Sequence, residues 1–267
     1  MEHTKKLAVS IIPLLLMAIL LSETAEAYTF TQDFTKGYYW QSFPIKLAKF
    51  ATNPNDGTQL EDLTNEAISD WESATGKNIW EESEVQTSSS YSGNYIRWSE
   101  KFGEETGYDP TKTLAITIRY NKGTFFEQTV IILNGSLSYL KQNWGNSLKT
   151  TILHEIGHTI GLDHSKESAV MAASLTSVSS LQTDDIQGAN AVLDESLKRQ
   201  STGFVSPFST STTEKNSLVP ACGTIEEVGG GKGSGRGGSN FIVSLLIGLL
   251  AGVLASKRKS QKVFIRY

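Results

Sequence analysis

Three observations predict an α+β domain framed by two apolar segments in this chain of 267 residues. Several short runs are rich in aromatic and β-branched residues, as β-strands are. Three longer stretches repeat apolar residues three and four positions apart, which is the spacing of one helix face. Two further runs, one near each end, are apolar without such a period and lie beside basic residues. We therefore expect the middle of the chain to form the folded domain and the two ends to be targeting or anchoring segments.

Residues 1–27 have the layout of a secretory signal peptide. Lys5 and Lys6 supply a positive start, and the apolar run Leu7–Leu21 follows them. The stretch Ala25–Ala27, with the sequence AEA, has small residues at both outer positions, so we expect cleavage directly after it. The alternative is an uncleaved anchor helix, for which the apolar run is short.

The apolar run Phe241–Ser256 predicts a single C-terminal transmembrane-type helix that anchors an exported protein at the cell-envelope surface. It is slightly short for a bilayer span, and the basic tail 257–267 follows at once, as after a stop-transfer segment. The same layout resembles prokaryotic C-terminal sorting signals. If the C-terminal segment is such a signal, the stretch Ala221–Thr224 would be its processed motif and Cys222 would be modified. A simple membrane anchor and a processed sorting signal both remain open at this point.

Composition divides the rest of the chain into two zones. Residues 28–197 have the mixed content of a globular domain, whereas residues 198–240 are rich in Ser, Thr and Gly and predict a flexible linker. The net charge is −4 and no basic cluster lies in the globular zone, so nothing indicates a nucleic-acid surface. The single cysteine, Cys222, allows no internal disulfide, so the fold must depend on its core and any bound metal.

The β-strands are predicted from period-two alternation and from apolar runs between turn residues. The sequence NPNDGT at Asn53–Thr58 predicts a turn after the first strand. The last two strands are apolar enough to be central in a sheet or to line a site. The predicted strands are Tyr38–Phe50, Asn78–Val85, Tyr95–Phe102, Thr113–Asn121 and Gln128–Ser136.

Three helices are predicted from apolar spacing and end signals. The first, Leu60–Thr75, ends at a glycine. The second, Ser147–Ile160, follows a polar loop at 136–145, and Asn146 or Ser147 would cap it. The third, Leu181–Leu197, opens with Thr183, Asp184 and Asp185, which suit a helix N-terminus.

The second helix carries the chemistry, because three of the four histidines of the chain lie in HEIGHTIGLDH. His154 and His158 are four residues apart, so both imidazoles leave one helix face. Gly161 allows the backbone to reverse, which brings His164 back as a third ligand. Three neutral imidazoles leave the fourth position of a zinc ion open, as a catalytic site requires. Glu155 flanks the same face without being a ligand.

This arrangement predicts hydrolysis of an amide bond. A zinc ion lowers the pKa of a bound water and polarises the scissile carbonyl. Glu155 would act as general base, taking the proton of that water and passing it to the leaving amine. A bare H-E-x-x-H occurs by chance on many helices. The extension to a third histidine is far more specific and is the metzincin signature among zinc peptidases.

The chain resembles the matrixins, the metzincin family that contains the matrix metalloproteinases. Beyond the zinc motif, the run Gly161–Ser165 is similar to the matrixin sequence through the third ligand. Met171 lies where the family keeps its Met-turn beneath the zinc. The run Leu181–Leu193 resembles the helix that follows in the family, and Leu60–Ser83 resembles its first helix and next strand. The likeness covers 28–197.

The resemblance implies a zincin-like catalytic domain with a twisted, mixed five-stranded sheet, three helices and an open cleft across the zinc. It implies that Met171 supports the site from below, and that substrate lies as an extra strand along the sheet edge. By order along the chain that edge strand would be Leu114–Tyr120, although an ordinary buried strand is the alternative. One catalytic Zn²⁺ is expected, because no spare histidine exists for the second zinc of vertebrate-type matrixins.

Other family features are missing. No acidic calcium loop is visible, so calcium is conceivable through residues such as Asp109 but is not indicated. No pro-segment with a zinc-blocking cysteine is visible; Cys222 could in principle reach back to the zinc. The run Ala172–Ser177 replaces the usual Pro-x-Tyr wall, so side-chain preference cannot be carried over from the family.

These features predict an exported, surface-tethered zinc endopeptidase that acts on protein or peptide substrates, contacts the membrane through its C-terminal segment and is a monomer. The alternative is a tethered adhesin or binding module in which the metal is not catalytic. A peptidase with one dedicated protein partner is also compatible with the sequence.

Overall fold

The structure is a computed structural model that describes residues 27–50, 54–86, 91–218 and 222–224. The predicted signal peptide up to residue 26, the predicted anchor Phe241–Ser256 and the basic tail lie outside these residues. In the described part of the chain, no helix has both the length and the apolar character needed to cross a bilayer.

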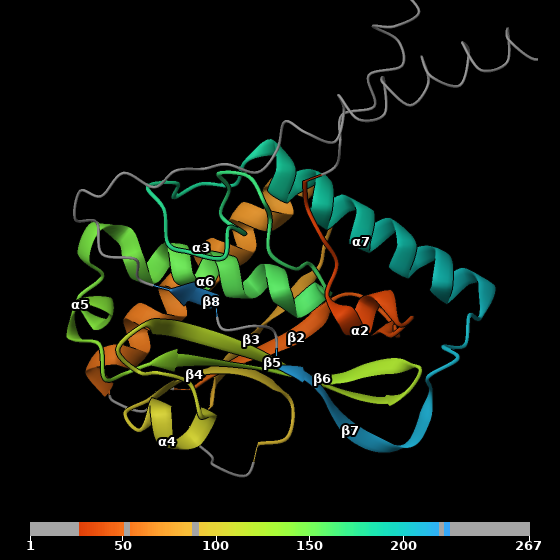
Figure 1. The fold of residues 1–267 in the computed structure, drawn as a ribbon, viewed down its shortest axis with the longest axis horizontal. Coiled ribbons are helices and arrows are strands. Elements are labelled where there is room, and N and C mark those ends of the chain that lie inside the picture. The colour runs from red at the N-terminus through yellow and green to blue at the C-terminus, as the bar shows by residue number, and fades with distance from the viewer. Residues whose placement is uncertain (1–26, 51–53, 87–90, 219–221, 225–267) are drawn as a thin grey trace, which may run out of the picture. The chain divides into compact units, whose positions relative to one another are not determined.

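A mixed β-sheet forms one layer of the fold (Figure 1). It has eight strands among the described residues, and not the five that were predicted. Five of them lie in the order β3, β2, β4, β6, β5, and among these β5 alone runs antiparallel to its neighbour β6. The two-residue strand β1 pairs with the start of β6. The strands span Tyr39–Trp40 (β1), Ile45–Phe50 (β2), Trp80–Gln86 (β3), Asn94–Ser99 (β4), Thr113–Gly123 (β5) and Phe125–Asn134 (β6).

The prediction that Leu114–Tyr120 forms the sheet edge is wrong, because β5 is paired on both sides. Strands β7 (Thr210–Leu218) and β8 (Cys222–Thr224) lie antiparallel to it on the side away from β6. Both come from the zone expected to be a flexible linker. Its threonines favour extended backbone, and pairing satisfies the N–H and C=O groups that an open edge would expose.

Three long helices lie on one side of the sheet, α3 (Pro54–Thr75), α6 (Ser147–Ile160) and α7 (Thr183–Thr202) (Figure 1). Helix α3 begins at Pro54, so the turn predicted at Asn53–Thr58 is wrong. Proline at the first helical position lacks only an N–H that would have no helical partner there. Helix α7 continues past Leu197, where the globular zone was expected to end. Short helices are α2 (Gln32–Thr35), α4 (Phe102–Thr106), α5 (Ser138–Lys141) and the 3₁₀ turn η1 (Trp144–Asn146).

Helix α6 is the central element, because every residue from Thr150 to Ile160 is buried. Three tryptophans from different elements donate their indole N–H groups to it. Trp71 of α3 bonds the Leu153 carbonyl at 2.8 Å. Trp40 and Trp80 bond the carbonyl and the hydroxyl of Thr159 at 2.8 and 3.0 Å. These bonds fix the position of the helix that carries the zinc motif.

The N-terminus of α6 is capped by a residue that the sequence did not indicate. Neither Asn146 nor Ser147 caps the helix with its side chain. Instead, Asn143 Oδ1 accepts hydrogen bonds from the N–H groups of Leu148 and Lys149, at 2.9 and 3.2 Å. The turn η1 lies between Asn143 and α6 and brings Asn143 back over the helix end. Local sequence spacing does not reveal such a turn.

We therefore expect Asn143→Gly to destabilise the protein by about 1 kcal/mol, because the N–H groups of Leu148 and Lys149 lose their acceptor and a hydrogen bond contributes about 0.5–1.5 kcal/mol. Asn143 and Asn146 both have left-handed backbone, with φ of 51° and 64°, so glycine preserves the conformation at either position. Asn146→Gly is the matched control. Urea unfolding measures both variants, and equal losses of unfolding free energy would contradict the capping role of Asn143.

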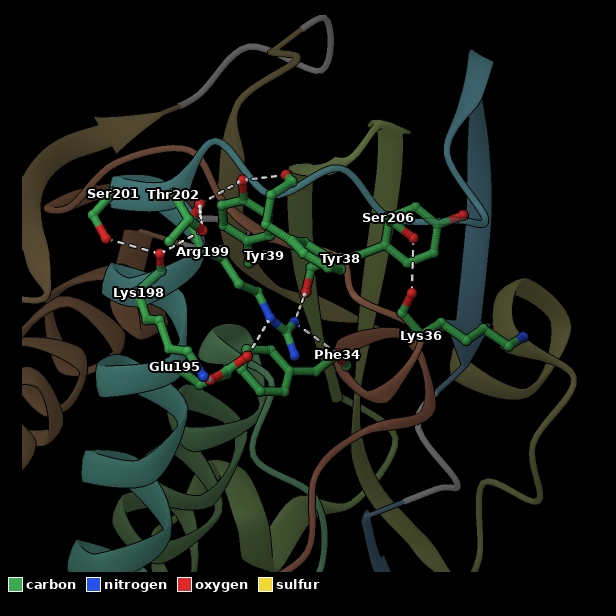
Figure 2. Close-up of polar contacts among 11 residues, drawn as sticks. Phe34, Lys36, Tyr38, Tyr39, Glu195, Lys198, Arg199, Ser201, Thr202 and Ser206 are labelled. Atoms are coloured by element: carbon green, nitrogen blue, oxygen red, sulfur yellow. Dashed lines mark hydrogen bonds and ion pairs between the residues drawn. The ribbon is translucent and has the colours of Figure 1, made fainter.

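Arg199 fixes the end of α7 to the first elements of the chain, as Figure 2 shows. Its guanidinium bonds Glu195 at 3.0 Å and the carbonyls of Phe34 and Tyr38 at 2.9 and 3.3 Å. It also lies over the Phe34 ring, 4.4 Å from the centroid. Beyond the helix, the buried Ser206 donates to the Lys36 carbonyl at 2.7 Å. The chain is therefore held in place as it leaves α7 toward β7.

Candidate metal centre

The structure brings His154, His158 and His164 together as predicted. One ring nitrogen of each lies within 4.8 Å of the others, and the ring centroids are 4.7 to 5.3 Å apart. Gly161 ends α6 with φ of 111°, which confirms the predicted left-handed reversal. Its missing side chain also makes room for Phe34, since a Cβ atom there would lie 2.9 Å from that ring.

Hydrogen bonds to backbone carbonyls decide which nitrogens face the centre. His154 Nδ1 lies 2.6 Å from the Val170 carbonyl, and His158 Nδ1 lies 2.7 Å from the Leu162 carbonyl. A carbonyl only accepts, so both Nδ1 atoms carry the proton and both Nε2 atoms present lone pairs. These two Nε2 atoms are 3.0 Å apart. Two facing lone pairs repel each other, and a shared cation removes that repulsion.

Burial keeps the imidazoles neutral, as metal ligation requires. Burial and the nearby His164 lower the pKa of His154 to about 3. Burial, followed by the two neighbouring histidines, also holds the pKa of His158 well below its usual value. Burial lowers the pKa of His164 as well, against the opposing effect of Asp163. Three neutral nitrogens that converge in this way fit Zn²⁺.

Glu155 lies beside the metal centre and is fully buried. Its Oε2 accepts a hydrogen bond of 2.5 Å from the hydroxyl of Thr117 in β5. Thr117 is a residue that the sequence analysis did not select. The sequence does carry one indication of its role. Thr117 is a polar residue in an otherwise apolar strand, and it lies two positions from Arg119, so both side chains leave the same face of β5. Thr117 fixes the direction in which the Glu155 carboxylate points.

We expect Thr117→Val to lower kcat by about ten- to a hundredfold, since a hydrogen bond to a charged group contributes ~1.5–3 kcal/mol. KM and the zinc content should change little, because the hydroxyl of Thr117 bonds Glu155 and not a zinc ligand. Steady-state kinetics with metal analysis measures these effects. Thr117→Ser keeps the hydroxyl and should restore kcat. A serine variant as slow as the valine variant would contradict the positioning role.

Met171 is buried directly beneath α6. A Cβ atom on Gly157 would lie 2.6 Å from Met171 Sδ and 2.9 Å from Trp71, so the helix and the methionine are in close contact. Asp185 holds this turn in place, because it accepts from the N–H groups of Val170 and Met171 at 3.0 and 2.9 Å.

Asp185 also forms the capping box that opens α7, which agrees with its predicted place at the helix start. Its bond to the Gln182 N–H measures 2.7 Å. Asp184 instead accepts from the Ser165 hydroxyl at 2.6 Å. The buried carboxylate of Asp185 therefore links the N-terminus of α7 to the turn beneath the metal centre. The sequence showed only the helix-start role, because the other contact crosses a long loop.

A pocket opens beside His154 and Glu155. Leu114 of β5 and two threonines of α6 form one side, and the loop after the third histidine forms the other. The segment Ala172–Ser177, which replaces the wall usual in the family, supplies part of that loop. The lining residues are Leu114, Thr150, Thr151, His154, Glu155, Ala169, Val170, Ala172, Ser174, Leu175, Thr176 and Val178.

A buried ion pair fixes the other end of the metal-binding helix. Arg119 of β5 bonds Asp33 of α2 through two nitrogens, at 2.6 and 2.9 Å, and donates a third bond of 2.7 Å to the His158 carbonyl. Burial by itself would raise the pKa of Asp33, but the charge and hydrogen bonds of Arg119, together with hydrogen bonds from the Thr31 hydroxyl and the Phe34 N–H, outweigh burial and lower it. The pair joins the N-terminal segment, the sheet and the C-terminus of α6.

In the described part of the chain, the three histidines are the single group of three or more His, Cys, Asp or Glu side chains placed to share an ion. Asp109, named above for calcium, accepts two hydrogen bonds from Thr111.

A mixed sheet, a buried helix with two histidines and a loop with the third define the class of zinc-dependent peptidases. The family model for matrixins matches residues 45–193, which is more than half of the chain. The protein belongs to the matrixin family and is a zinc metalloendopeptidase whose catalytic zinc is bound by His154, His158 and His164. No curated protein matches the chain. Family membership therefore supports the predicted peptidase over the alternative, a binding module in which the metal is not catalytic.

Proposed function

We propose that Glu155 is the general base of this endopeptidase and that Met171 supports the zinc site from below. The observation that carries the first role is the position of the Glu155 carboxylate. It is buried beside the three histidines, lines the same pocket as His154, and is oriented by Thr117. The contact of Met171 with Gly157 supports the second role, because the helix rests on that side chain.

The chain's own residues prepare the reaction before substrate arrives. The zinc ion, when bound, acts as a Lewis acid and makes water more acidic. Val170 and Leu162 hold His154 and His158 in the tautomer that presents Nε2. Glu155 accepts a proton from water and returns it to the nitrogen of the leaving amine. Burial of the helix excludes bulk water, which strengthens each of these electrostatic interactions.

The pocket beside Glu155 accepts an apolar side chain of the substrate. Leu114, Val170, Leu175 and Val178 supply most of its apolar wall, and no lysine or arginine lines it. The free energy falls as an apolar side chain leaves water for such a surface, whereas a carboxylate would lose hydration without finding a cationic partner there. Cleavage next to apolar residues is therefore expected.

We further propose the chain organisation and location that the sequence predicts. Residues 1–27 are removed on export, and 28–197 form the main part of the peptidase domain. Residues 198–240 add the end of α7 and strands β7 and β8 to that domain and lead to the anchor at 241–256 and its basic tail 257–267. The support is the pattern of apolar runs and flanking basic residues. The enzyme then acts at the cell surface on extracellular proteins.

We expect removal of zinc by a chelator to abolish cleavage of an unfolded protein substrate, and stoichiometric zinc to restore it. The histidines converge on one ion and no second group of three ligands exists in the described residues, so one zinc per chain should suffice. Metal analysis alongside a protein-cleavage assay measures this. Mass spectrometry of the products tests the apolar preference. Cleavage that persists after complete zinc removal would contradict the mechanism.

A further inference from the structure

Strand β5 borders the metal centre on one side and a segment of its own chain on the other. Thr117 of β5 bonds Glu155, and Leu114 lines the pocket that contains His154 and Glu155. Any strand that pairs with the outer side of β5 near these residues therefore passes beside the reactive groups.

The outer side of β5 is occupied by residues 210–218 and 222–224, which we call the covering segment. Ile118 lies opposite Leu218, Ala115 opposite Cys222, and Thr113 opposite Thr224. Residues 222–224 thus pair with the part of β5 that is nearest to Leu114 and Thr117. An extended peptide that adds a strand to a sheet needs unpaired backbone N–H and C=O groups. The covering segment uses these groups on β5.

We propose that the covering segment is a built-in competitor for extended substrates and must leave β5 before such a substrate can pair there. The proposal rests on the proposed endopeptidase function and adds its regulation. A peptide that pairs with β5 beside Leu114 would reach Glu155 directly, and residues 222–224 hold that same stretch of strand. While the covering segment is paired with the outer side of β5, a substrate cannot pair with the same backbone groups.

The segment is held at this place from one end. Beyond α7, Ser206 bonds the Lys36 carbonyl, as Figure 2 shows, and its N–H bonds Thr124 between β5 and β6. Tyr38 also donates its hydroxyl to the Phe208 carbonyl. A strand tethered a few residues away binds as if at millimolar concentration, so it competes well with dilute substrate.

The pairing of the covering segment is nevertheless the weaker of the two ladders on β5. The β5–β6 register shifts once over eight matched pairs, between Tyr120 and Asn121. The covering segment matches β5 at six positions, four in β7 and two in β8, and the β5–β7 register shifts twice. Each shift leaves backbone groups out of the ladder, and elements with fewer well-formed bonds open at lower free energy. The segment therefore opens without loss of the central sheet.

A reversible lock on the full chain tests the proposal. Cys222 is the one cysteine of the sequence and lies opposite Ala115, so Ala115→Cys allows a cross-strand disulfide. Oxidation with diamide should lower kcat/KM on an unfolded protein at least about tenfold, and a phosphine reductant should restore it. Ala115→Ser is the control for the substitution and for the oxidant. A variant shown by mass spectrometry to be fully cross-linked, yet as fast as its reduced form, would overturn the proposal.

A second variant tests the opposite direction and does not depend on a disulfide. Lys215 lies opposite Tyr120 in the covering segment, and Lys215→Pro removes a backbone donor there. We expect kcat/KM on the unfolded protein to rise several-fold, while Lys215→Ala, which keeps the backbone N–H, matches the native chain. No rise with proline would contradict the proposal. If no variant, oxidised or reduced, showed zinc-dependent cleavage, the proposed function itself would fail instead.

Discussion

Glu155→Gln should lower kcat/KM by about 10²–10⁴-fold, the usual contribution of a general base, while the protein keeps its zinc. Glutamine has nearly the same shape and can still accept the Thr117 hydrogen bond, but it cannot take up a proton. The histidines and their carbonyl partners are untouched, so metal analysis should still find one zinc per chain. The measurement is cleavage of an unfolded protein, followed over time at equal enzyme concentration.

Glu167→Gln is the matched control, because it removes the same charge from an exposed residue of the loop after the third histidine. It should cleave at the native rate. A Glu155→Gln preparation free of other peptidases that still turned over at the native rate would refute the role of Glu155. Loss of zinc together with activity would mean that Glu155 acts on the site's structure and not on the proton.

Asp33→Asn should lower the free energy of unfolding by about 3–5 kcal/mol, because it leaves Arg119 buried without its countercharge. Both side chains are almost completely buried, with exposed fractions of 1% for Asp33 and 0% for Arg119. The guanidinium would keep its bond to the His158 carbonyl but lose an anion that fully neutralises it. Urea unfolding at neutral pH measures the loss.

The same pair predicts a pH dependence of stability. The pKa of Asp33 in the folded protein is held below its ordinary value of 3.8, since Arg119 and the hydrogen bonds from Thr31 and Phe34 together outweigh the effect of burial. A lowered pKa contributes stability that is present above the ordinary value and is lost as the pH falls through the folded value. The difference between native protein and Asp33→Asn should therefore shrink below about pH 4.

Replacing both partners is the control for this prediction. Asp33→Asn combined with Arg119→Met removes the uncompensated charge and should be more stable than Asp33→Asn alone. A double variant that is less stable than the single variant would contradict the account of Arg119 as a charge that needs Asp33.

The zinc-binding residues could be predicted because their geometry is local. His154, His158, Gly161 and His164 lie within one helix and the turn that ends it, so sequence spacing determines where they point. The five central strands were predicted from alternation and apolar runs in the same way. The role of Asp185 at the start of α7 also depended on local signals.

The residues that orient the site could not be predicted, because they act across long separations in sequence. Thr117 reaches Glu155 from another element, and Asn143 caps α6 only because η1 folds back. The prediction of an edge strand failed for the same reason. Whether β5 is an edge depends on where residues 210–218 and 222–224 lie, and their polar composition suits a linker and an outer strand equally well.

By itself, the sequence determined the metal, its three ligands and the reaction class, since those follow from side-chain chemistry at helical spacing. The tertiary structure alone decided which groups hold that chemistry in position. It placed Thr117 against Glu155, Arg119 against Asp33 and the His158 carbonyl, and the covering segment along β5. Buried polar groups and open strand edges must find partners, and the partner is whichever segment the fold brings within reach.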